Sequence, residues 1–524
     1  AIAIAENTTA VTTAPSRNVD GGVPAYSIVA GDDGGLFTID GSTGGLSFVN
    51  APDYENPADD GADNVYNLTV RVSDGNGGLD TQALVVTVGN IADGIRVTPI
   101  SVVAIGGETL VNTVTADTQR LDANVAQAIA SDANGNYVVV WVSNLQDGAL
   151  LGIYAQRFSA DGTAQGAEFQ VNSTTADDQL GASVAMDAGG NFVISWYSSL
   201  QDGDGYGVYA QRFNAAGVAQ GGEFLVNTTT AGGQTSPAIA MSSSGAFVIA
   251  WTDSAQDLSA SGIYAQRFDA AGVALGGEFR VNTYTTNQQQ ITSAAMDGAG
   301  NFVITWGSLG QDGSNYGVYG QRYAADGTAR GAEFRVNTTT ANSQLYHDVV
   351  MLADGRFVVA FQSLNAGGSY EVYVQRYAAD GAAEGGETRV NAVSVSGMQP
   401  IPSLSADTYG NIVVVWNQAD AAGAGVFGHR LDWSGNSLGG VFQVNTSTAG
   451  NQQYPEVLSQ SDGGFIVAWG GNGVGDAAGV FMQRYGLTTD EAGGTASFQV
   501  VLEAAPTADV TIPISVSDGS EGSG

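Results

Sequence analysis

The chain has 524 residues, of which 43% are hydrophobic and 74 are glycine, and its formal net charge is −36. Such a length and composition predict a soluble, multidomain, mostly β protein, and no apolar run approaches the length that spans a bilayer. All 16 basic residues are arginine, so the acidic surface is expected to repel nucleic acid and anionic lipid, and the absence of cysteine excludes disulfides and thiol catalysis.

Residues 1–90 alternate polar and apolar positions, and turn signals containing Asp-Gly separate the segments. This pattern predicts a β-sandwich of about seven short strands. The residues also resemble a bacterial cadherin-like repeat over the whole segment. The matching stretches are AENT from Ala5, AYSI from Ala25, LFTIDGSTGGLSF from Leu36, PDYENPAD from Pro52 and VYNLTVRVSDGNGGLDTQALVVTV from Val65.

The resemblance implies a calcium site at one end of this module, held by oxygen ligands from separated loops. The residues at the matching positions are Glu6, Asn18, Asp20, Asp53, Glu55, Asp74, Asn90 and Asp93. A hard cation with about six to eight oxygen ligands would offset the repulsion between these carboxylates. The alternative is that the acidic residues only form turns.

Residues 91–105 are expected to be a linker, and residues 106–485 contain seven copies of a repeat of about 55 residues. An aromatic residue closes the central apolar run of each copy: Trp141, Trp196, Trp251, Trp306, Phe361, Trp416 and Trp469. Clusters of Asp, Asn and Gly divide each copy into four short antiparallel strands. The second strand is apolar on both faces, so each sheet must pack between neighbours, which predicts a seven-bladed β-propeller.

The order of the strands also predicts how the ring closes. A fourth strand follows only the first six copies, and its sequence recurs ahead of the first copy, as GGETLVN from Gly106 against GGEFLVN from Gly221. The N-terminal strand is therefore expected to pair with the last copy beside Arg484 and Tyr485. This pairing would remove two free sheet edges.

The loop between the second and third strands carries Gln-Asp in the first four copies. Its aspartates are Asp147, Asp202, Asp257 and Asp312. The loop is expected on the same side of the ring as the connections between copies, so one rim would present Asp, Gln, Asn and Thr side chains suited to glycans or calcium. The alternative is that each aspartate only forms a tight turn.

A Gln-Arg-aromatic triplet recurs on the third strand. Its arginines are Arg157, Arg212, Arg267, Arg322, Arg376, Arg430 and Arg484. Such equal spacing favours an architectural role over a catalytic arginine cluster. The expected partner is the glutamate that opens the fourth strand, found at Glu168, Glu223, Glu278, Glu333 and Glu387, with Glu108 serving the last copy. The sixth copy departs, with His429 in place of glutamine and Val441 in place of glutamate.

Motifs of enzymes are absent from the sequence. The two histidines, His347 and His429, lie at positions where the other copies have none, and no phosphate loop, zinc helix or paired cysteine motif occurs. A hydrolase would need a cluster of perturbed carboxylates in the central channel of the ring. We therefore expect no enzymatic activity.

Residues 486–524 resemble the opening of a Calx-β-like module, on the stretch LTTDEAGGTASFQVVLEAAPTADVTIPISVSDGSEGSG from Leu487. The stretch covers about a third of such a domain, and two strands alone are marginally stable in water. Either the natural chain continues beyond Gly524, or another protomer supplies the missing strands. The expected fold is therefore all-β: a cadherin-like sandwich, a propeller closed by an N-terminal strand, and an incomplete sandwich segment.

These three segments together resemble a section of a large bacterial secreted or surface protein. The expectation is a non-catalytic extracellular or cell-surface adhesion or structural protein, with calcium stiffening the N-terminal module. The alternatives are a lectin that binds glycans through the rim loops and a self-assembling filament subunit that exchanges strands at its C-terminal segment. Glycans, other surface proteins and further copies of the chain are the expected partners, without nucleic acid or membrane insertion.

Overall fold

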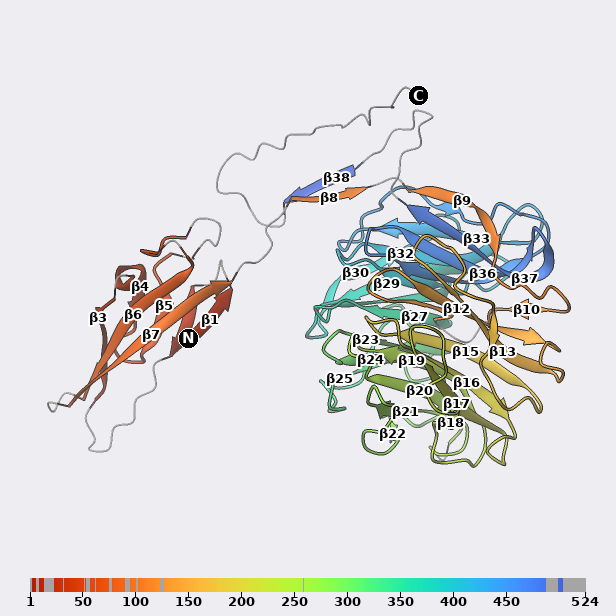
Figure 1. The fold of residues 1–524 in the computed structure, drawn as a ribbon, viewed down its shortest axis with the longest axis horizontal. Coiled ribbons are helices and arrows are strands. Elements are labelled where there is room, and N and C mark those ends of the chain that lie inside the picture. Colours follow the sequence, from red (N-terminus) through yellow and green to blue (C-terminus); the bar gives the residue numbers. More distant parts are fainter. Residues whose placement is uncertain are drawn as a thin grey trace, which may run out of the picture. The chain divides into compact units, whose positions relative to one another are not determined.

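The computed structural model describes residues 2–5, 9–13, 23–31, 33–50, 52, 57–61, 63–74, 78–89, 95–99, 102–122, 127–257, 259–486 and 498–502. The described residues form strands and one short 3-10 helix, Gly34–Leu36, which confirms the all-β class (Figure 1). None of the described helices could cross a bilayer by length and hydropathy. The chain divides into two compact units, residues 1–98 with 499–524 and residues 99–498, and each is described by itself.

The first unit contains two small sheets that share one core. One sheet has the order β1 (Ile2–Ala5), β7 (Leu79–Gly89), β6 (Val65–Ser73) and β3 (Ala25–Ala30). The other has the order β2 (Ala10–Thr13), β5 (Gly45–Phe48) and β4 (Phe37–Ile39). Alternate residues of β6 are buried against aromatic residues of the second sheet, so the period-two pattern of the sequence has its physical cause in this core. A further pair of strands joins β8 (Ile95–Pro99) to β38 (Phe498–Leu502).

The second unit repeats one antiparallel four-stranded sheet. The second sheet shows the pattern, with β15 (Gln179–Met186), β16 (Phe192–Ser199), β17 (Tyr206–Phe213) and β18 (Phe224–Leu225) paired in sequence order. The third to sixth sheets follow the same order: β19 (Gln234–Met241), β20 (Phe247–Asp253), β21 (Gly262–Phe268), β22 (Phe279–Arg280); β23 (Gln289–Met296), β24 (Phe302–Leu309), β25 (Tyr316–Tyr323), β26 (Phe334–Arg335); β27 (Gln344–Met351), β28 (Phe357–Leu364), β29 (Tyr370–Tyr377), β30 (Ala383–Arg389); β31 (Ser403–Ala406), β32 (Ile412–Ala419), β33 (Ala424–Leu431), β34 (Phe442–Gln443).

The first and last sheets vary this pattern. The first sheet divides its innermost strand in two, so that β10 (Gln119–Arg120) and β11 (Ile129–Ser131) both pair with β12 (Tyr137–Asn144), which is followed by β13 (Leu151–Phe158) and β14 (Phe169–Gln170). The last sheet consists of β35 (Gln452–Ser459), β36 (Phe465–Gly473), β37 (Asp476–Gly486) and β9 (Val103–Leu110). Its outermost strand therefore comes from the N-terminal side of the repeats.

The second strand of each sheet is buried on both faces. In β16, Ile194 and Trp196 belong to a core shared with the first sheet, while Val193 belongs to a core shared with the third sheet. Alternate side chains of one strand therefore pack against opposite neighbours. This explains why the strand reads as a continuous apolar run in the sequence.

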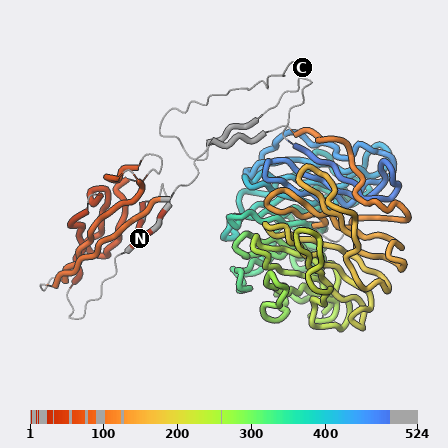
Figure 2. Tube along the Cα trace, in the orientation of Figure 1, coloured from red at the N-terminus to blue at the C-terminus, as the bar shows by residue number. Residues whose placement is uncertain are grey.

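The innermost strands surround a common axis. Each one contacts the innermost strand of the next sheet, and β35 of the last sheet contacts β11 of the first. The strand β9 pairs antiparallel with β37, with Leu110 opposite Phe481 and Thr109 opposite Met482. Figure 2 shows this N-terminal strand, in orange, against the blue C-terminal sheet. The predicted closure of the repeat array is confirmed by this register.

Side-chain hydrogen bonds, here called clasps, join each of these sheets to the sheets before and after it. Arg157 Nη1 donates to Ala215 O in the second sheet at 2.7 Å. Glu223 of the second sheet accepts hydrogen bonds from Ser173 N and Thr174 Oγ1, which follow the first sheet, each at 2.6 Å. Burial opposes ionisation of Glu223, but these hydrogen bonds outweigh it and lower its pKa.

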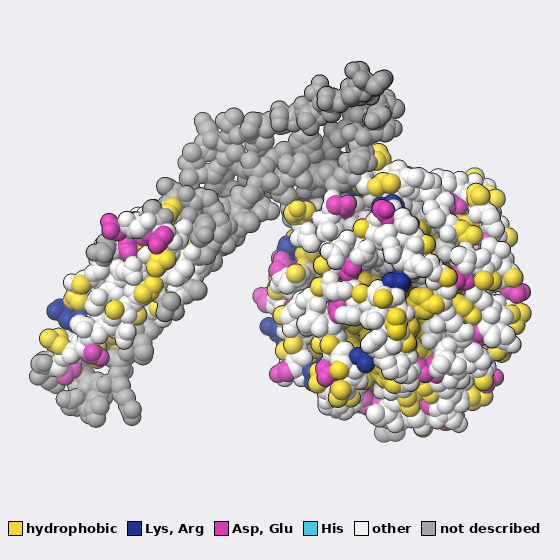
Figure 3. Space-filling model, in the orientation of Figure 1, with side chains coloured by type: hydrophobic (Ala, Val, Ile, Leu, Met, Phe, Trp, Pro, Cys, Tyr) yellow, Lys and Arg dark blue, Asp and Glu magenta, His cyan; other side chains and the backbone are white. Residues whose placement is uncertain are grey.

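The predicted pairing of each arginine with the glutamate of its own copy is therefore wrong. The arginine side chain leaves its sheet toward the following sheet, and the glutamate side chain leaves toward the preceding one. The same two contacts recur around the ring, for example Arg212 with Ala270 O and Thr228 N with Glu278. Figure 3 shows the acidic surface that the net charge predicts, with more magenta carboxylates than blue arginines on the visible face.

Candidate functional site

The predicted calcium ligands are almost all outside the described residues. Of the eight positions, the structure describes Asp74, whose Oδ1 accepts a hydrogen bond from Gly78 N at 2.8 Å in the turn after β6. The other seven lie outside the described residues: Glu6, Asn18, Asp20, Asp53, Glu55, Asn90 and Asp93. Within the described part of the chain, no group of three or more acidic or histidine side chains is arranged to hold a metal ion. Calcium binding stays a prediction.

The four rim aspartates form turns within their own loops. Their Oδ1 atoms accept hydrogen bonds from backbone N–H groups two residues on, at 3.0 Å for Asp147, 3.3 Å for Asp202, 3.2 Å for Asp257 and 3.1 Å for Asp312. In the second sheet, a Cβ on Gly207 would lie 2.6 Å from Oδ2 of Asp202, so a larger residue there would displace this carboxylate. The carboxylates thus serve the loops, and a ligand on this rim remains a prediction.

The structure brings two other carboxyl groups together at the axis of the ring. The position concerned lies on the innermost strand of each sheet. It pairs with the residue just before the recurring aromatic residue of the second strand, as Ser183 pairs with Ser195, the residue before Trp196. Five sheets carry a small residue there: Ala128, Ser183, Ala238, Ser293 and Ser403. The fifth sheet carries Asp348 and the last sheet carries Glu456.

Both carboxyl groups are buried in hydrogen bonds with neighbouring sheets. Asp348 is 3% exposed, and it accepts from Ser293 Oγ at 2.9 Å and from Leu404 N at 3.0 Å. Glu456 is 7% exposed, and its Oε2 accepts from Gln127 N at 3.0 Å and from Ser403 Oγ at 3.3 Å. The sixth sheet, which carries Ser403, lies between the two carboxyl groups.

Burial raises the pKa values of both carboxyl groups, to different extents. Burial raises the pKa of Asp348 to about 6, against the hydrogen bonds from Leu404 and Ser293 that lower it. Burial, and after it the charge of Asp348, raise the pKa of Glu456 to about 8. Burial lowers the pKa of the adjacent His347 to about 4, so this imidazole stays neutral and does not offset the carboxylates. The two carboxyl groups therefore lose their protons in separate steps, and between these steps the pair holds one proton, as a general acid beside a general base does.

Two tyrosines precede these carboxyl groups by two residues on the same strands. Tyr346 and Tyr454 have positive φ angles, 36° and 55°, at the bulges that interrupt β27 and β35. Gly181 adopts this left-handed backbone at the same place in the second sheet. This conformation costs roughly 1–3 kcal/mol of stability when a bulky residue adopts it. Burial raises the pKa of the Tyr346 hydroxyl, and the neighbouring Tyr454 adds to this effect, so the two phenols lie near each other.

A cavity of about 440 Å³ opens beside Tyr454, between the last and first sheets. Its polar lining includes Arg120, Asn451, Gln453 and Asn472, with Gly450 and Gly470 among the remaining residues. Part of this lining belongs to the rim that the sequence predicted to bind a ligand, because Gly450 and Asn451 lie on the loop between β34 and β35 and Asn472 lies near the end of β36. An aromatic ring beside several hydrogen-bonding groups is the composition of a sugar-binding pocket.

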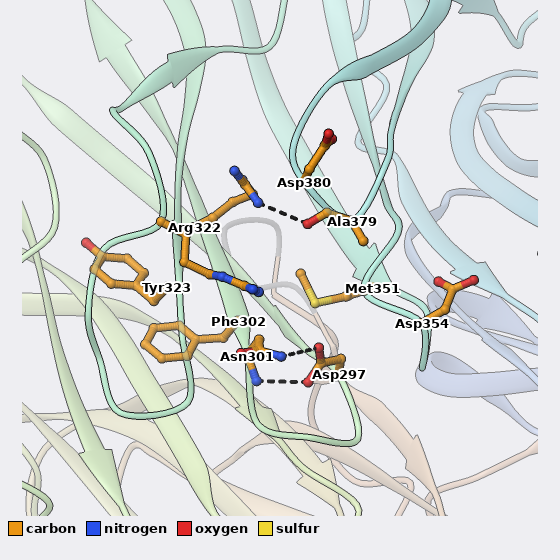
Figure 4. A pocket seen from close by; sticks show the side chains of 11 residues that line it. Asp297, Asn301, Phe302, Arg322, Tyr323, Met351, Asp354, Ala379 and Asp380 are labelled. Atoms are coloured by element: carbon orange, nitrogen blue, oxygen red, sulfur yellow. Dashed lines mark hydrogen bonds between the residues drawn. The ribbon is translucent and has the colours of Figure 1, made fainter. Parts of the chain in front are cut away.

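A second cavity, of about 330 Å³, lies between the fourth and fifth sheets and is drawn in Figure 4. Its polar groups are engaged in the turns around it: Asn301 Nδ2 donates to Asp297 at 2.8 Å, and Arg322 Nη1 donates to Ala379 O at 3.0 Å. An equivalent cavity of about 170 Å³ lies between the first and second sheets, lined by Arg157. The cavity is therefore a property of the repeat, whereas the carboxyl pair departs from it.

Comparison with known proteins gives similar folds only. No protein-family model and no curated protein matches the chain. Among solved structures, an α-L-arabinanase of Penicillium chrysogenum complexed with arabinobiose has 10% identity and a TM-score of 0.42, covering 73% of this chain and 98% of its own. The Hadza microbial sialidase Hz136 has 10% identity and a TM-score of 0.40, covering 85% and 77%. The β-propeller domain of the trilobed protease from Pyrococcus furiosus has 10% identity and a TM-score of 0.32, covering 60% and 81%.

This comparison contradicts the prediction of a non-catalytic adhesion or structural protein that is not an enzyme, since the arabinanase and the sialidase are glycoside hydrolases by name. The sequence argument failed because it looked for acidic residues in loops and for short catalytic motifs. The feature that it missed is the change from Ala or Ser to Asp348 and Glu456 at one repeat position. It was visible once the copies were aligned, but the meeting of the two side chains depends on the ring.

Proposed function

We propose that the chain is a glycan-hydrolysing enzyme whose acid and base are Glu456 and Asp348. The observation that carries this proposal is the pair of buried carboxyl groups at the axis of the ring, held by hydrogen bonds and with raised pKa values. Glu456 would protonate the oxygen of the scissile glycosidic bond, and the carboxylate of Asp348 would take a proton from the attacking water. The proton lost by one carboxyl group and the proton gained by the other balance the addition of one water molecule.

The tyrosine-lined cavity supplies the binding part of the proposal. Tyr454 offers an apolar face to a sugar ring, and Arg120, Asn451 and Asn472 offer donors and acceptors to its hydroxyl groups. Glu456 follows Tyr454 by two residues, so the strand β35 links the cavity to the acid. A neutral or weakly charged glycan suits this site, because the chain as a whole is strongly acidic.

One side chain crosses the axis close to the acid. Gln127 Nε2 reaches across the axis from the first sheet and donates to Ala294 O of the fourth sheet at 3.2 Å. A sugar that approaches Glu456 would displace this amide. The backbone N–H of the same residue holds Glu456 Oε2, so the acid keeps its position when the side chain swings away.

The proposal is tested by turnover on a panel of polysaccharides, including arabinan, with release of reducing ends as the measurement. Glu456→Gln and Asp348→Asn are expected to lower kcat by at least a hundredfold, because each removes one partner of the proton transfer. The rate is expected to rise as Asp348 ionises above about pH 6 and to fall as Glu456 ionises above about pH 8. Tyr454→Ser, which introduces the residue found at Ser236 in the third sheet, is expected to raise KM with little effect on stability.

A matched control is Asp202→Ala, which removes a rim carboxylate outside the cavity and should leave turnover unchanged. Folding of each variant is followed by thermal unfolding, so that loss of structure is separated from loss of chemistry. Turnover by Glu456→Gln at the wild-type rate, or no product from any glycan with the wild-type protein, would refute the assignment.

We further propose a context for this site. The repeated sheets are taken as the blades of a seven-bladed β-propeller, in an extracellular protein. Residues 1–90 are taken as a cadherin-like module that binds calcium, and residues 486–524 as the start of a Calx-β-like module. The support for these assignments is the order of sequence stretches quoted above, the shared core of the two N-terminal sheets and the acidic, cysteine-free composition.

A further inference from the structure

The sixth sheet departs from the repeat at two positions that contact each other. At one position of the third strand, the sixth sheet carries His429 and every other sheet carries glutamine. The glutamines are Gln156, Gln211, Gln266, Gln321, Gln375 and Gln483. Opposite the last residue of that strand, six sheets carry alanine and the sixth carries Ser437; the alanines are Ala164, Ala219, Ala274, Ala329, Ala383 and Ala104. Both changes occur in the same sheet.

The geometry of His429 fixes which nitrogen carries its proton. Nδ1 lies 2.8 Å from Val390 O, and Nε2 lies 2.7 Å from Ser437 Oγ. A carbonyl oxygen only accepts hydrogen bonds, so Nδ1 must donate. In the neutral imidazole, Nε2 is then an acceptor. The single hydroxyl proton of Ser437 has two acceptors within reach, His429 Nε2 and Gly439 O, and it must turn from the carbonyl to donate to the imidazole. This is the relation of a nucleophile to its general base, with the base oriented by a third group.

The histidine does not repeat the task of the glutamine that it replaces. In the first sheet, Gln156 Nε2 donates to Arg157 O at 2.8 Å and to Gly166 O at 3.2 Å, which fastens the turn of its own sheet. His429 turns instead to Val390, at the end of the outermost strand of the fifth sheet. The exchange therefore replaces a structural amide with a positioned base.

The serine is accessible from solvent. Ser437 is exposed, and His429 is half-buried. The turn that contains Ser437 continues through Gly439 and Gly440, which are both exposed. Gly439 O is a second acceptor within reach of the serine hydroxyl.

We propose that Ser437 and His429 form a second catalytic site, which cleaves small carboxylic esters. Ser437 Oγ attacks the ester carbonyl carbon while its proton passes to His429 Nε2. The bond to the alcohol breaks, and the alcohol leaves with that proton. Water then attacks the acyl-serine with His429 as its base, which releases the carboxylic acid and restores the serine. This proposal is independent of the carboxyl pair at the ring axis.

The experiment uses a fluorophosphonate probe and 4-nitrophenyl acetate on the full chain. The wild-type protein is expected to be labelled at Ser437, located by peptide mass spectrometry, and to release nitrophenol. Ser437→Ala should abolish both signals, and His429→Gln should slow both by at least a hundredfold. These variants introduce the residues that the other six sheets carry, so the sheet is expected to fold, which thermal unfolding verifies.

The matched control is Ser314→Ala, which removes another exposed turn serine, one that donates to Asn342 O and has no histidine partner among the described residues. It should leave labelling and ester cleavage at the wild-type level. Absence of probe from Ser437 in the wild-type protein, or equal labelling of Ser437 in the His429→Gln variant, would overturn the proposal and leave the pair as a structural hydrogen bond.

Discussion

The catalytic residues that we propose are all single residues that break the repeat. Asp348 and Glu456 replace small residues on the innermost strands, and Ser437 with His429 replaces Ala and Gln in the sixth sheet. Each change places a carboxyl group, an imidazole or a hydroxyl group where the other sheets carry a different residue. Comparison between copies of the repeat thus finds candidate sites even though no homologous sequences are compared.

The protonation of Glu456 predicts how stability depends on pH. Its pKa is raised in the folded protein to about 8, from about 4.5 for an unburied glutamate, so the folded state holds a proton that the unfolded state has lost between these values. The contribution of Glu456 to the free energy of unfolding is therefore full below about pH 4.5 and falls as the pH rises toward 8, by at most about 1.4 kcal/mol per pH unit.

Urea unfolding at a series of pH values measures this slope. The Glu456→Gln variant, which keeps the shape of the side chain without its titration, should show a flatter profile and exceed the wild type in stability at alkaline pH. Superimposable profiles of the two proteins would contradict the raised pKa.

At the scale of the elements, the sequence predicted the sheets well and their mutual contacts poorly. The turn clusters and the apolar runs gave the four strands of each copy, because backbone pairing is local in sequence. The arginine and glutamate clasps were assigned to the wrong partners, since spacing along a strand does not reveal which neighbouring sheet a long side chain reaches. Arg157 and Glu223 each contact a sheet other than their own.

The clasp made by Glu223 predicts a measurable loss of stability. Glu223→Ala removes the acceptor for Ser173 N, Thr174 Oγ1 and Gln201 Nε2. Because the carboxylate is partly buried, its removal is expected to lower the free energy of unfolding by about 1–3 kcal/mol. Asp204→Ala, which removes an exposed carboxylate with one bond to Gly232 N, should change it by less than about 0.5 kcal/mol. Equal effects of the two substitutions would contradict the clasp.

The N-terminal module gives a prediction of its own at this scale. If residues 1–90 bind calcium, excess chelator should lower the melting temperature of one transition of the full chain, and added calcium should restore it. Magnesium at the same concentration is the control, because it favours stricter octahedral geometry and retains its water ligands. A calorimetric profile that chelator leaves unchanged would remove the metal from this module.

At the scale of the whole molecule, the closure of the ring followed from the sequence. The stretch GGETLVN matched the outermost strands of the other copies, so the pairing of β9 with β37 could be deduced from an absent fourth strand after the last copy. The axis could not be predicted in the same way. Which side chains meet there depends on the rotation of each sheet about the ring, and a pattern of residues along one strand does not contain that information.

The pairing of β9 with β37, which is the seam of the ring, can be tested directly because the chain has no cysteine of its own. Thr109 lies opposite Met482 in the register of β9 and β37. The double variant Thr109→Cys with Met482→Cys is expected to form a disulfide on mild oxidation and to melt at a higher temperature than its reduced form. Thr109→Cys with Gly479→Cys, which lies three residues out of register, should not form it. Cross-linking of the second pair alone would contradict the register.

The seam also sets the order of events when the protein is made. The strand β9 leaves the ribosome before any other part of the ring, yet its neighbour β37 is synthesised after every other repeat is complete. The ring therefore closes only after its last strand has been synthesised, and β9 stays without its partner until then. A product that lacked β37 would leave β9 and β36 each with a free sheet edge.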